Sequence, residues 1–328
     1  LATAQGILAV MYAQGQGVGQ DQAQALHWYR LAAEQGLAEA QFSLGGMYEK
    51  GQGVPADPAQ AAHWYRLAAQ QDLADAQVNL GGLYLLGQGV PKDVNKALKW
   101  LRKAADLGAA AAQYNLGVLY HQGQGVIVDL PEAARWFGKA AQQGDVKAQY
   151  ALANLYYTGG PGLPQNLFEA RRWFTQAVQL GQAQAQYNLG VMFANGQGMP
   201  PNPAEAAKWY RQAADLGLAE AQYNLGVAYY GGAGVPQNQA QAAAWFAKAA
   251  GQGYPLAMFY LGDMYDKGLG VPQDDQQAYL WLSLAAARLT GPGQLKTLAR
   301  LNALSGKIPP DQLWRLQERI RLWQPLTP

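Results

Sequence analysis

The stretch that decides the fold covers residues 112–144 and reads AQYNLGVLYHQGQGVIVDLPEAARWFGKAAQQG. At 100° per residue, Ala112, Leu116, Leu119 and Tyr120 fall on one stripe of a helix. The second half of the stretch has the same apolar spacing around its tryptophan. No segment alternates apolar and polar residues with period two, so strands are not needed. The stretch therefore predicts two short amphipathic helices joined by a glycine-rich turn.

The same pattern returns along the chain, and tryptophan marks each copy. Successive tryptophans are 36, 36, 36, 36, 37, 36 and 36 residues apart. The single extra residue falls in the Gly-Gly-Pro-Gly run at 159–162, where a loop can absorb it. Eight repeats fill about the first 290 of 328 residues, which replaces the two-domain expectation from length. The marking residues are Trp28, Trp64, Trp100, Trp136, Trp173, Trp209, Trp245 and Trp281.

The ends of the helices repeat as well. First helices are followed by Gly-x-Gly-Val-Pro or a close variant. The glycine favours a left-handed cap that ends the helix, and the proline then prevents the helix from continuing. Second helices mostly end at glycine, and Asp72 takes that place once because Asp tolerates the left-handed region. A Glu or Gln three residues after the N-cap predicts a capping box in seven repeats, and Lys96 predicts a weaker start. The expected N-cap residues are Asp21, Asp57, Asp93, Asp129, Asn166, Asn202, Asn238 and Asp274.

One hairpin of short helices cannot bury its apolar stripe alone, but stacked hairpins can. The pattern Ala-Gln-Tyr-Asn-Leu-Gly-x-x-Tyr-x-x-Gly-x-Gly-Val, then Ala-x-x-Trp-Tyr/Phe-x-x-Ala-Ala-x-x-Gly, resembles the Sel1-like repeat, a relative of the tetratricopeptide repeat. We expect an all-α fold: a right-handed α–α superhelix (solenoid) of eight ~36-residue helix-turn-helix repeats with a C-terminal helical cap. The fifth repeat departs from the pattern at Ala151, Ala153 and Asn154, and the first at Gly6 and Ile7, so the first repeat is expected to be incomplete or capping.

The end of the chain differs, which divides it into a repeat region at 1–290 and a capping region at 291–328. Gly-Pro-Gly at 291–293 interrupts the pattern. We expect one helix over about 294–304 and another from Asp311, as its N-cap, to about residue 323. From residue 288 onward seven Lys/Arg stand against two Asp/Glu. The apolar stripe of the last helix is predicted at Leu313, Leu316, Ile320 and Trp323.

Composition excludes several classes of function. With 24 Lys+Arg, 22 Asp+Glu and a net charge of +2, a basic nucleic-acid binder is not expected. The absence of cysteine excludes disulfides, thiol nucleophiles and thiolate metal sites. No apolar run reaches about 18 residues, so no membrane span is predicted. The chain begins at Leu1 rather than at methionine, so we expect it to be trimmed and take nothing about export from its start.

Reactive constellations are not found. The glycine-rich loops lack the strand context and third glycine of a dinucleotide site and the Lys-Ser/Thr of a Walker loop. His27 and His63 occupy equal positions in adjacent repeats, on the order of 10–20 Å apart. That separation is too large for ligands lying about 2 Å from one zinc ion. We therefore expect no enzyme, no metal and no cofactor.

The predicted binding surface lies on the first helices, which line the concave face in the solenoids that the chain resembles. Opposite the core stripe of the fourth repeat lie Tyr114, Val118 and His121, with Asn115 beside them. An aromatic row beside an amide row suits an extended peptide. Alternatively, the rings pack between successive first helices and the amides bond within the stack. The other candidates at these positions are Tyr150, Tyr187, Tyr223, Asn188, Asn224, Tyr157 and Tyr230, with Phe42, Val78, Asn79 and Phe259 at equivalent places.

We expect a non-enzymatic protein–protein interaction scaffold, adaptor or receptor that binds a protein or extended peptide. The resemblance implies such adaptor roles, although a fold supports many functions. One alternative is a structural or oligomerisation module that docks through its ends, with Arg315, Arg319 or Trp323 essential. Another is a binder of small cell-wall or β-lactam-like ligands. The Ala- and Gln-rich, cysteine-free composition resembles bacterial members, so we expect a periplasmic or secreted protein, with the cytoplasm as the second expectation.

Overall fold

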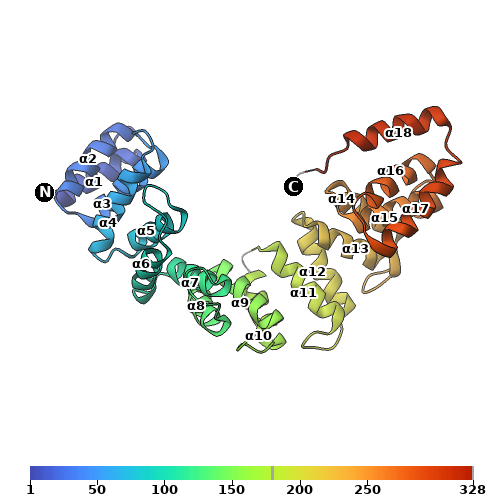
Figure 1. The fold of residues 1–328 in the computed structure, drawn as a ribbon, viewed down its shortest axis with the longest axis horizontal. Coiled ribbons are helices and arrows are strands. Elements are labelled where there is room, and N and C mark those ends of the chain that lie inside the picture. The colour runs from blue at the N-terminus through green and yellow to red at the C-terminus, as the bar shows by residue number, and fades with distance from the viewer. Residues whose placement is uncertain (179–180, 327–328) are drawn as a thin grey trace. The chain divides into compact units, whose positions relative to one another are not determined.

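The computed structural model describes residues 1–178 and 181–326, and all regular structure in that part is helical (Figure 1). The first helices of the repeats are α1 (Ala2–Gln14), α3 (Ala38–Lys50), α5 (Ala74–Leu86), α7 (Ala110–Gln122), α9 (Val146–Thr158), α11 (Ala183–Asn195), α13 (Ala219–Gly231) and α15 (Pro255–Lys267). The second helices are α2 (Gln22–Glu34), α4 (Pro58–Gln70), α6 (Val94–Asp106), α8 (Leu130–Gln142), α10 (Leu167–Val178), α12 (Pro203–Asp215), α14 (Gln239–Gly251) and α16 (Asp275–Ala286). Two further helices follow, α17 (Gly291–Ser305) and α18 (Pro310–Leu322). The all-α prediction of paired helices is confirmed.

In four repeats, the second, fourth, sixth and seventh, an aromatic ring of the second helix packs directly against a glycine of the first helix. In the fourth repeat the ring of Phe137 on α8 lies over Gly117 on α7, and a Cβ at that glycine would come within 2.5 Å of the ring. Gly226 and Phe246 are arranged the same way in the seventh repeat. Because any larger residue would push the helices apart, these glycines set how closely the two helices approach each other.

The turns follow the predicted capping chemistry. Gly123 ends α7 in the left-handed region with φ 69°, and Asp72 adopts φ 59° after α4 as expected. Asp129 accepts the amide hydrogen of Glu132 at 2.9 Å, which satisfies a donor of the first turn of α8. The same type of side-chain cap is made by Asp21, Asp57, Asp93, Asn202, Asn238 and Asp274.

The predicted capping box is wrong in its second half. The Asp129 amide, which should bond back to the Glu132 side chain, donates instead to the carbonyl oxygen of Tyr120 on α7 at 3.0 Å. Glu132 turns outward and pairs with Arg135. The amide is therefore used to tie the second helix to the first. Lys96 also does not weaken its helix start, because Asp93 accepts its amide at 3.0 Å and pairs with its ammonium at 3.2 Å.

Buried glutamines join one repeat to the next. Gln113 on α7 donates to the carbonyl oxygen of Ala105, at the end of the preceding repeat, at 3.2 Å. Its own side-chain oxygen accepts from Gln143, which also donates to the Gly108 carbonyl at 2.9 Å. Gln222 and Gln252 make the same pair in the seventh repeat. We call this arrangement the glutamine joint; it satisfies the carbonyls at a helix end with uncharged groups.

The chain divides into two compact units, an N-terminal unit (Leu1–Asn166) and a C-terminal unit (Leu167–Pro328). Each has its own buried core. The N-terminal core is built mainly from alanines, leucines and tyrosines of α1 to α8, and the C-terminal core from the equivalent residues of α12 to α16 with α17 and α18. None of the described helices has the length and apolar character needed to cross a membrane.

Two boundaries in the C-terminal region differ from the sequence prediction. α17 begins at Gly291 rather than near residue 294, because a proline in the first turn lacks only an amide that the helix does not need. α18 begins at Pro310 with Pro309 as N-cap, so Asp311 lies inside the first turn and is not the cap. The predicted apolar stripe of this helix does pack inward, with Leu316 buried and the Trp323 ring 6.4 Å from that of Trp281 on α16.

Candidate functional site

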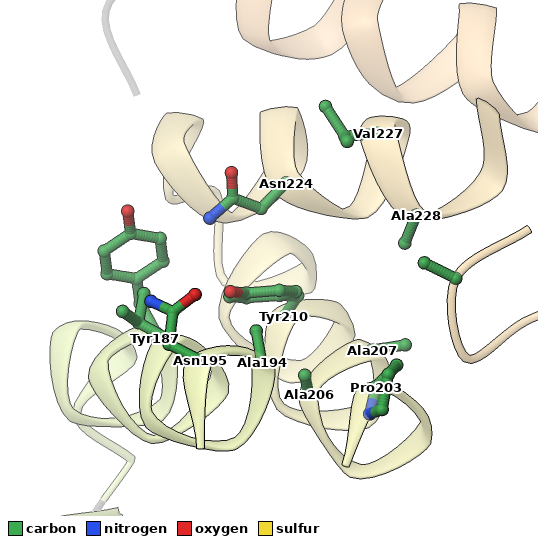
Figure 2. A pocket seen from close by; sticks show the side chains of 12 residues that line it. Tyr187, Ala194, Asn195, Pro203, Ala206, Ala207, Tyr210, Asn224, Val227 and Ala228 are labelled. Carbon is green, nitrogen blue, oxygen red and sulfur yellow. The ribbon is translucent and has the colours of Figure 1, made fainter. Parts of the chain in front are cut away.

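A pocket of about 460 Å³ opens in the C-terminal unit between α11, α12 and α13 (Figure 2). Ala194, Ala206 and Ala207 rise from the two lower helices, and Ala228 points down toward them from α13. The Tyr210 ring lies at one side of this space. The full lining is Tyr187, Val191, Ala194, Asn195, Pro203, Ala206, Ala207, Tyr210, Asn224, Val227, Ala228 and Ala233.

The pocket has a polar rim over an apolar floor. Tyr187, Tyr210, Asn195 and Asn224 bring the hydroxyl and amide groups to one side, and the Tyr187 and Tyr210 rings are 6.0 Å apart. Alanine, valine and proline side chains make up the rest of the lining. No lining residue carries a formal charge at neutral pH. Such a site can hold an apolar group and offer hydrogen bonds at its edge.

The corresponding pocket of the N-terminal unit is smaller and charged. Between the first and second repeats a hollow of about 250 Å³ includes Tyr29, Glu49, Lys50 and Tyr65 in its lining. The Tyr65 hydroxyl donates to Glu49 at 2.6 Å, and burial, with that acceptor, raises the pKa of the tyrosine far above its ordinary value. The two pockets share a position in the repeat but differ in the chemistry that they offer.

Five predicted site residues lie in the N-terminal unit. Tyr114 is half-buried, with its ring 5.6 Å from that of Phe137 in the same hairpin. Burial, and secondarily the Asp145 carboxylate, raises the pKa of Tyr114. Asn115 on α7 and both Tyr150 and Tyr157 on α9 are also half-buried, whereas His121 is exposed in the last turn of α7. None of these side chains lines the hollow between the first and second repeats or the one beside α1.

The other five lie in the C-terminal unit, and two of them meet. Tyr187 and Asn224 both line the uncharged pocket. Asn188 is half-buried on α11 but does not line it.

Tyr223 and Tyr230 belong instead to an aromatic cluster with Tyr260, at ring separations of 5.9 Å each. Burial is the largest cause of the raised pKa of Tyr223, and neighbouring tyrosines add to it. This contact joins successive first helices, as the alternative interpretation of the row expected.

A family model decides what this array of hairpins is. The model described as Sel1 repeat matches eight times, over residues 2–37, 38–73, 74–108, 110–145, 146–182, 183–218, 219–254 and 255–288. The chain belongs to the Sel1 repeat family.

Two solved structures are similar over most of this Sel1 repeat chain. A protective antigen of uropathogenic Escherichia coli with an SLR fold is 33% identical, with a TM-score of 0.72, over 97% of this chain and 75% of the antigen. A Sel1 repeat protein from Oxalobacter formigenes is 36% identical, with a TM-score of 0.70, over 90% and 87%. A comparison with curated proteins finds no match. The Sel1 repeat solenoid is a protein-interaction fold, and its family is typically non-catalytic.

The Sel1 repeats show why a pocket forms at this place. At the tenth position of the repeat, the seventh repeat has Ala228, whereas each of the other seven repeats has Leu or Met. In the next turn, Ala233 occupies a position that is Gln in five copies. The sequence analysis missed Ala228, Ala233, Tyr210 and Asn195. Aligning the repeats and looking for a shortened side chain is the signal that finds the first two.

The chemistry available at this pocket is non-covalent binding. Its lining holds no serine, lysine, histidine or carboxylate that could act as nucleophile or base. Among the residues described, no group of three or more His, Asp or Glu side chains could hold a metal ion.

Proposed function

We propose that this Sel1 repeat protein is a non-catalytic scaffold or receptor that holds an extended peptide segment of a protein partner. The segment lies across the first helices of the C-terminal unit and is centred on the pocket between α11, α12 and α13. The observation that carries this proposal is the uncharged pocket itself, with tyrosine and asparagine at its rim and small apolar residues inside. Tyrosine gives contact area at low conformational cost, and amides pair with a peptide backbone.

The test introduces a charge into the pocket without removing a packed side chain. Val227 lines the pocket and is partly exposed, so Val227→Glu should leave the helix intact and repel an apolar ligand. Ala247→Glu on the exposed face of α14 is the matched control. Used as bait in an extract of the native organism, the wild type and the control should retain the same partner, and Val227→Glu should lose it. Equal capture by all three proteins would reject the pocket as the binding site.

The predicted aromatic row needs a separate test in each unit. We expect Tyr150→Ala and Tyr187→Ala to keep the far-ultraviolet circular dichroism of the wild type. If the row contacts the partner, capture should then fall at least tenfold with unchanged folding. If instead the variants lose their helical circular dichroism, and capture falls only in proportion to that loss, the rings are assigned to packing within the stack.

An end-docking role is the second candidate function, and α18 favours it. Trp314 and Leu322 are 64% and 71% exposed on this helix, and Arg315 and Arg319 line a hollow beside it with Gln276 and Gln312. A second copy of the chain is the proposed occupant. If so, Trp314→Ser should convert an oligomer into a monomer in analytical ultracentrifugation, and an unchanged sedimentation profile would remove this candidate.

The compartment that we propose is the bacterial periplasm or the cell exterior, with the cytoplasm as the alternative. Both similar structures come from bacterial proteins, and one of these proteins is a protective antigen. Fractionation of the native organism, followed by detection with an antibody against this chain, distinguishes these compartments.

A further inference from the structure

The seventh repeat lacks a side chain that every other repeat has. The tenth position is Met11, Met47, Leu83, Leu119, Leu155, Met192 and Met264 in the other seven repeats. From the second repeat onward these Leu and Met side chains are buried core residues. Ala228 is also 6% exposed or less, so the missing atoms leave space rather than a surface.

The side chains around Ala228 are too small to fill that space. Ala206 and Ala207 on α12 lie across the pocket from Ala228 (Figure 2). Ala233, in the turn after α13, also lines it. In a protein core, a shorter side chain is normally compensated by a larger one nearby, because the atoms that line a void lose dispersion contacts. Here small residues face small residues, and the polar side chains of Tyr187, Asn195 and Asn224 lie together at one side of the resulting hollow.

We propose that this pocket accepts one aliphatic side chain, of leucine or methionine size, from an uncharged segment of the bound peptide. The inference rests on the proposed function and names the residue class that it recognises. The occupant takes the place that the chain's own Leu or Met fills in the other repeats. The asparagine and tyrosine groups at the rim lie where the peptide groups on either side of that residue would pass.

The lining also defines what the pocket rejects. A charged side chain would lose its hydration among alanine, valine and proline and find no opposite charge there. The equivalent hollow between the first and second repeats contains Glu49 and Lys50, so it does not share this preference. Recognition should therefore belong to the seventh repeat, and it should depend little on ionic strength.

The first arm of the test restores the missing side chain. Ala228→Leu, with Ala228→Met as a second variant, should fill the pocket from within and raise the melting temperature of the full chain by roughly 2–6 °C. Ala247→Leu on the exposed face of α14 adds the same atoms to the surface and should leave the melting temperature unchanged. If neither Ala228 variant is more stable than this control, the space is not a vacated core position and the inference is overturned.

The second arm measures recognition with a phage-displayed library of random linear dodecapeptides, selected on the full wild-type chain. We expect the selected peptides to share Leu, Met or Ile at one position flanked by uncharged residues. Synthetic copies should bind Ala228→Leu at least tenfold more weakly than they bind the wild type or Ala247→Leu. Replacing the shared aliphatic residue with Asp in the peptide should abolish binding to the wild type.

The outcomes separate the inference from the proposed function. Peptides that are selected but bind Ala228→Leu and the wild type equally would overturn the aliphatic pocket and leave peptide binding standing. Selected peptides without a shared aliphatic residue would have the same meaning. If no peptide is selected, the proposed function fails and this inference fails with it.

Discussion

Tryptophan occupies one position in all eight repeats, yet the eight indoles are not buried equally. Trp136, Trp173 and Trp245 are 5% exposed, whereas the others are half-buried. Trp136 belongs to one core cluster with Leu98 and Leu101 of the preceding repeat, so its ring fills space between repeats. The ammonium of Lys139 lies 4.4 Å from the ring centre and covers it on the outer side.

Replacing Trp136 with alanine should lower the free energy of unfolding by about 3–5 kcal/mol, since it removes a large buried side chain from a junction. Ile127→Ala, at a side chain that is 90% exposed, should change it by no more than about 0.5 kcal/mol. Urea denaturation followed by circular dichroism measures both. Similar losses for the two variants would show that the repeated indole does not hold the repeats together.

At the scale of single residues, the sequence predicted the N-cap side chains better than it predicted the pocket left by a shortened side chain. The N-cap side chains could be named because Asp and Asn have one strong use before a helix. The bond from Asp129 to Tyr120 could not, since it depends on where the first helix ends in space. Ala228 attracted no notice because alanine is common at the joints of this chain, and only its position in the repeat makes it unusual.

At the scale of the element, the glutamine joint is incomplete in the third repeat. Gln77 on α5 donates to the Ala69 carbonyl at 3.0 Å, as its equivalents do. The residue that should donate to its side-chain oxygen is Leu107, at the position of Gln143 in the next repeat. Within the described residues that buried oxygen accepts no hydrogen bond, while the Leu107 side chain is 56% exposed.

Leu107→Gln should therefore stabilise the protein. It supplies the missing donor and removes an exposed apolar side chain, for a gain of roughly 0.5–1.5 kcal/mol. The control is Leu86→Gln, which replaces an exposed leucine at the end of α5 and should give no comparable gain. Thermal unfolding of both variants measures the difference, and a destabilised Leu107→Gln protein would contradict the joint as described.

The helices of the repeats were the most predictable elements, because the residues that begin and end them recur in each of the eight repeats. The two helices that occur once, α17 and α18, are where the boundaries were misplaced. The Gly-Pro-Gly run at 291–293 was taken as an interruption and Asp311 as an N-cap, whereas proline at the beginning of a helix is compatible with it. Among the candidate site residues, Tyr187 and Asn224 line one pocket, but helical spacing alone could not show that Tyr223 packs against Tyr260.

At the scale of the whole molecule, the last two helices cover the end of the repeat array. Leu304 on α17 is buried in one cluster with Leu282, and Leu316 on α18 packs in another with Leu280 and Leu284. Asp263 on α15 pairs with Arg300 on α17, which adds a buried ionic contact to the same attachment. A repeat array needs such a cover because its terminal repeat would otherwise expose a core face.

A chain ending at Thr290 should therefore aggregate or self-associate. Removing α17 and α18 takes away Leu316, which packs with Leu280 and Leu284, and Leu304, which packs with Leu282, so apolar side chains of α16 become exposed to water. Light scattering should show larger particles than the full chain gives, and the melting temperature should fall. A monomeric truncated protein with unchanged melting would show that the capping region at 291–328 has another purpose.

The glutamine joint has a consequence for how such a protein can lengthen. Its contacts are uncharged, and the glutamines of the fourth and seventh repeats each find a backbone acceptor in the repeat before. A 36-residue cassette that carries a complete joint could then be duplicated in frame, because the copy brings the same donors and acceptors with it. Evolution, or an engineer, could vary the number of modules around the seventh one without rebuilding it.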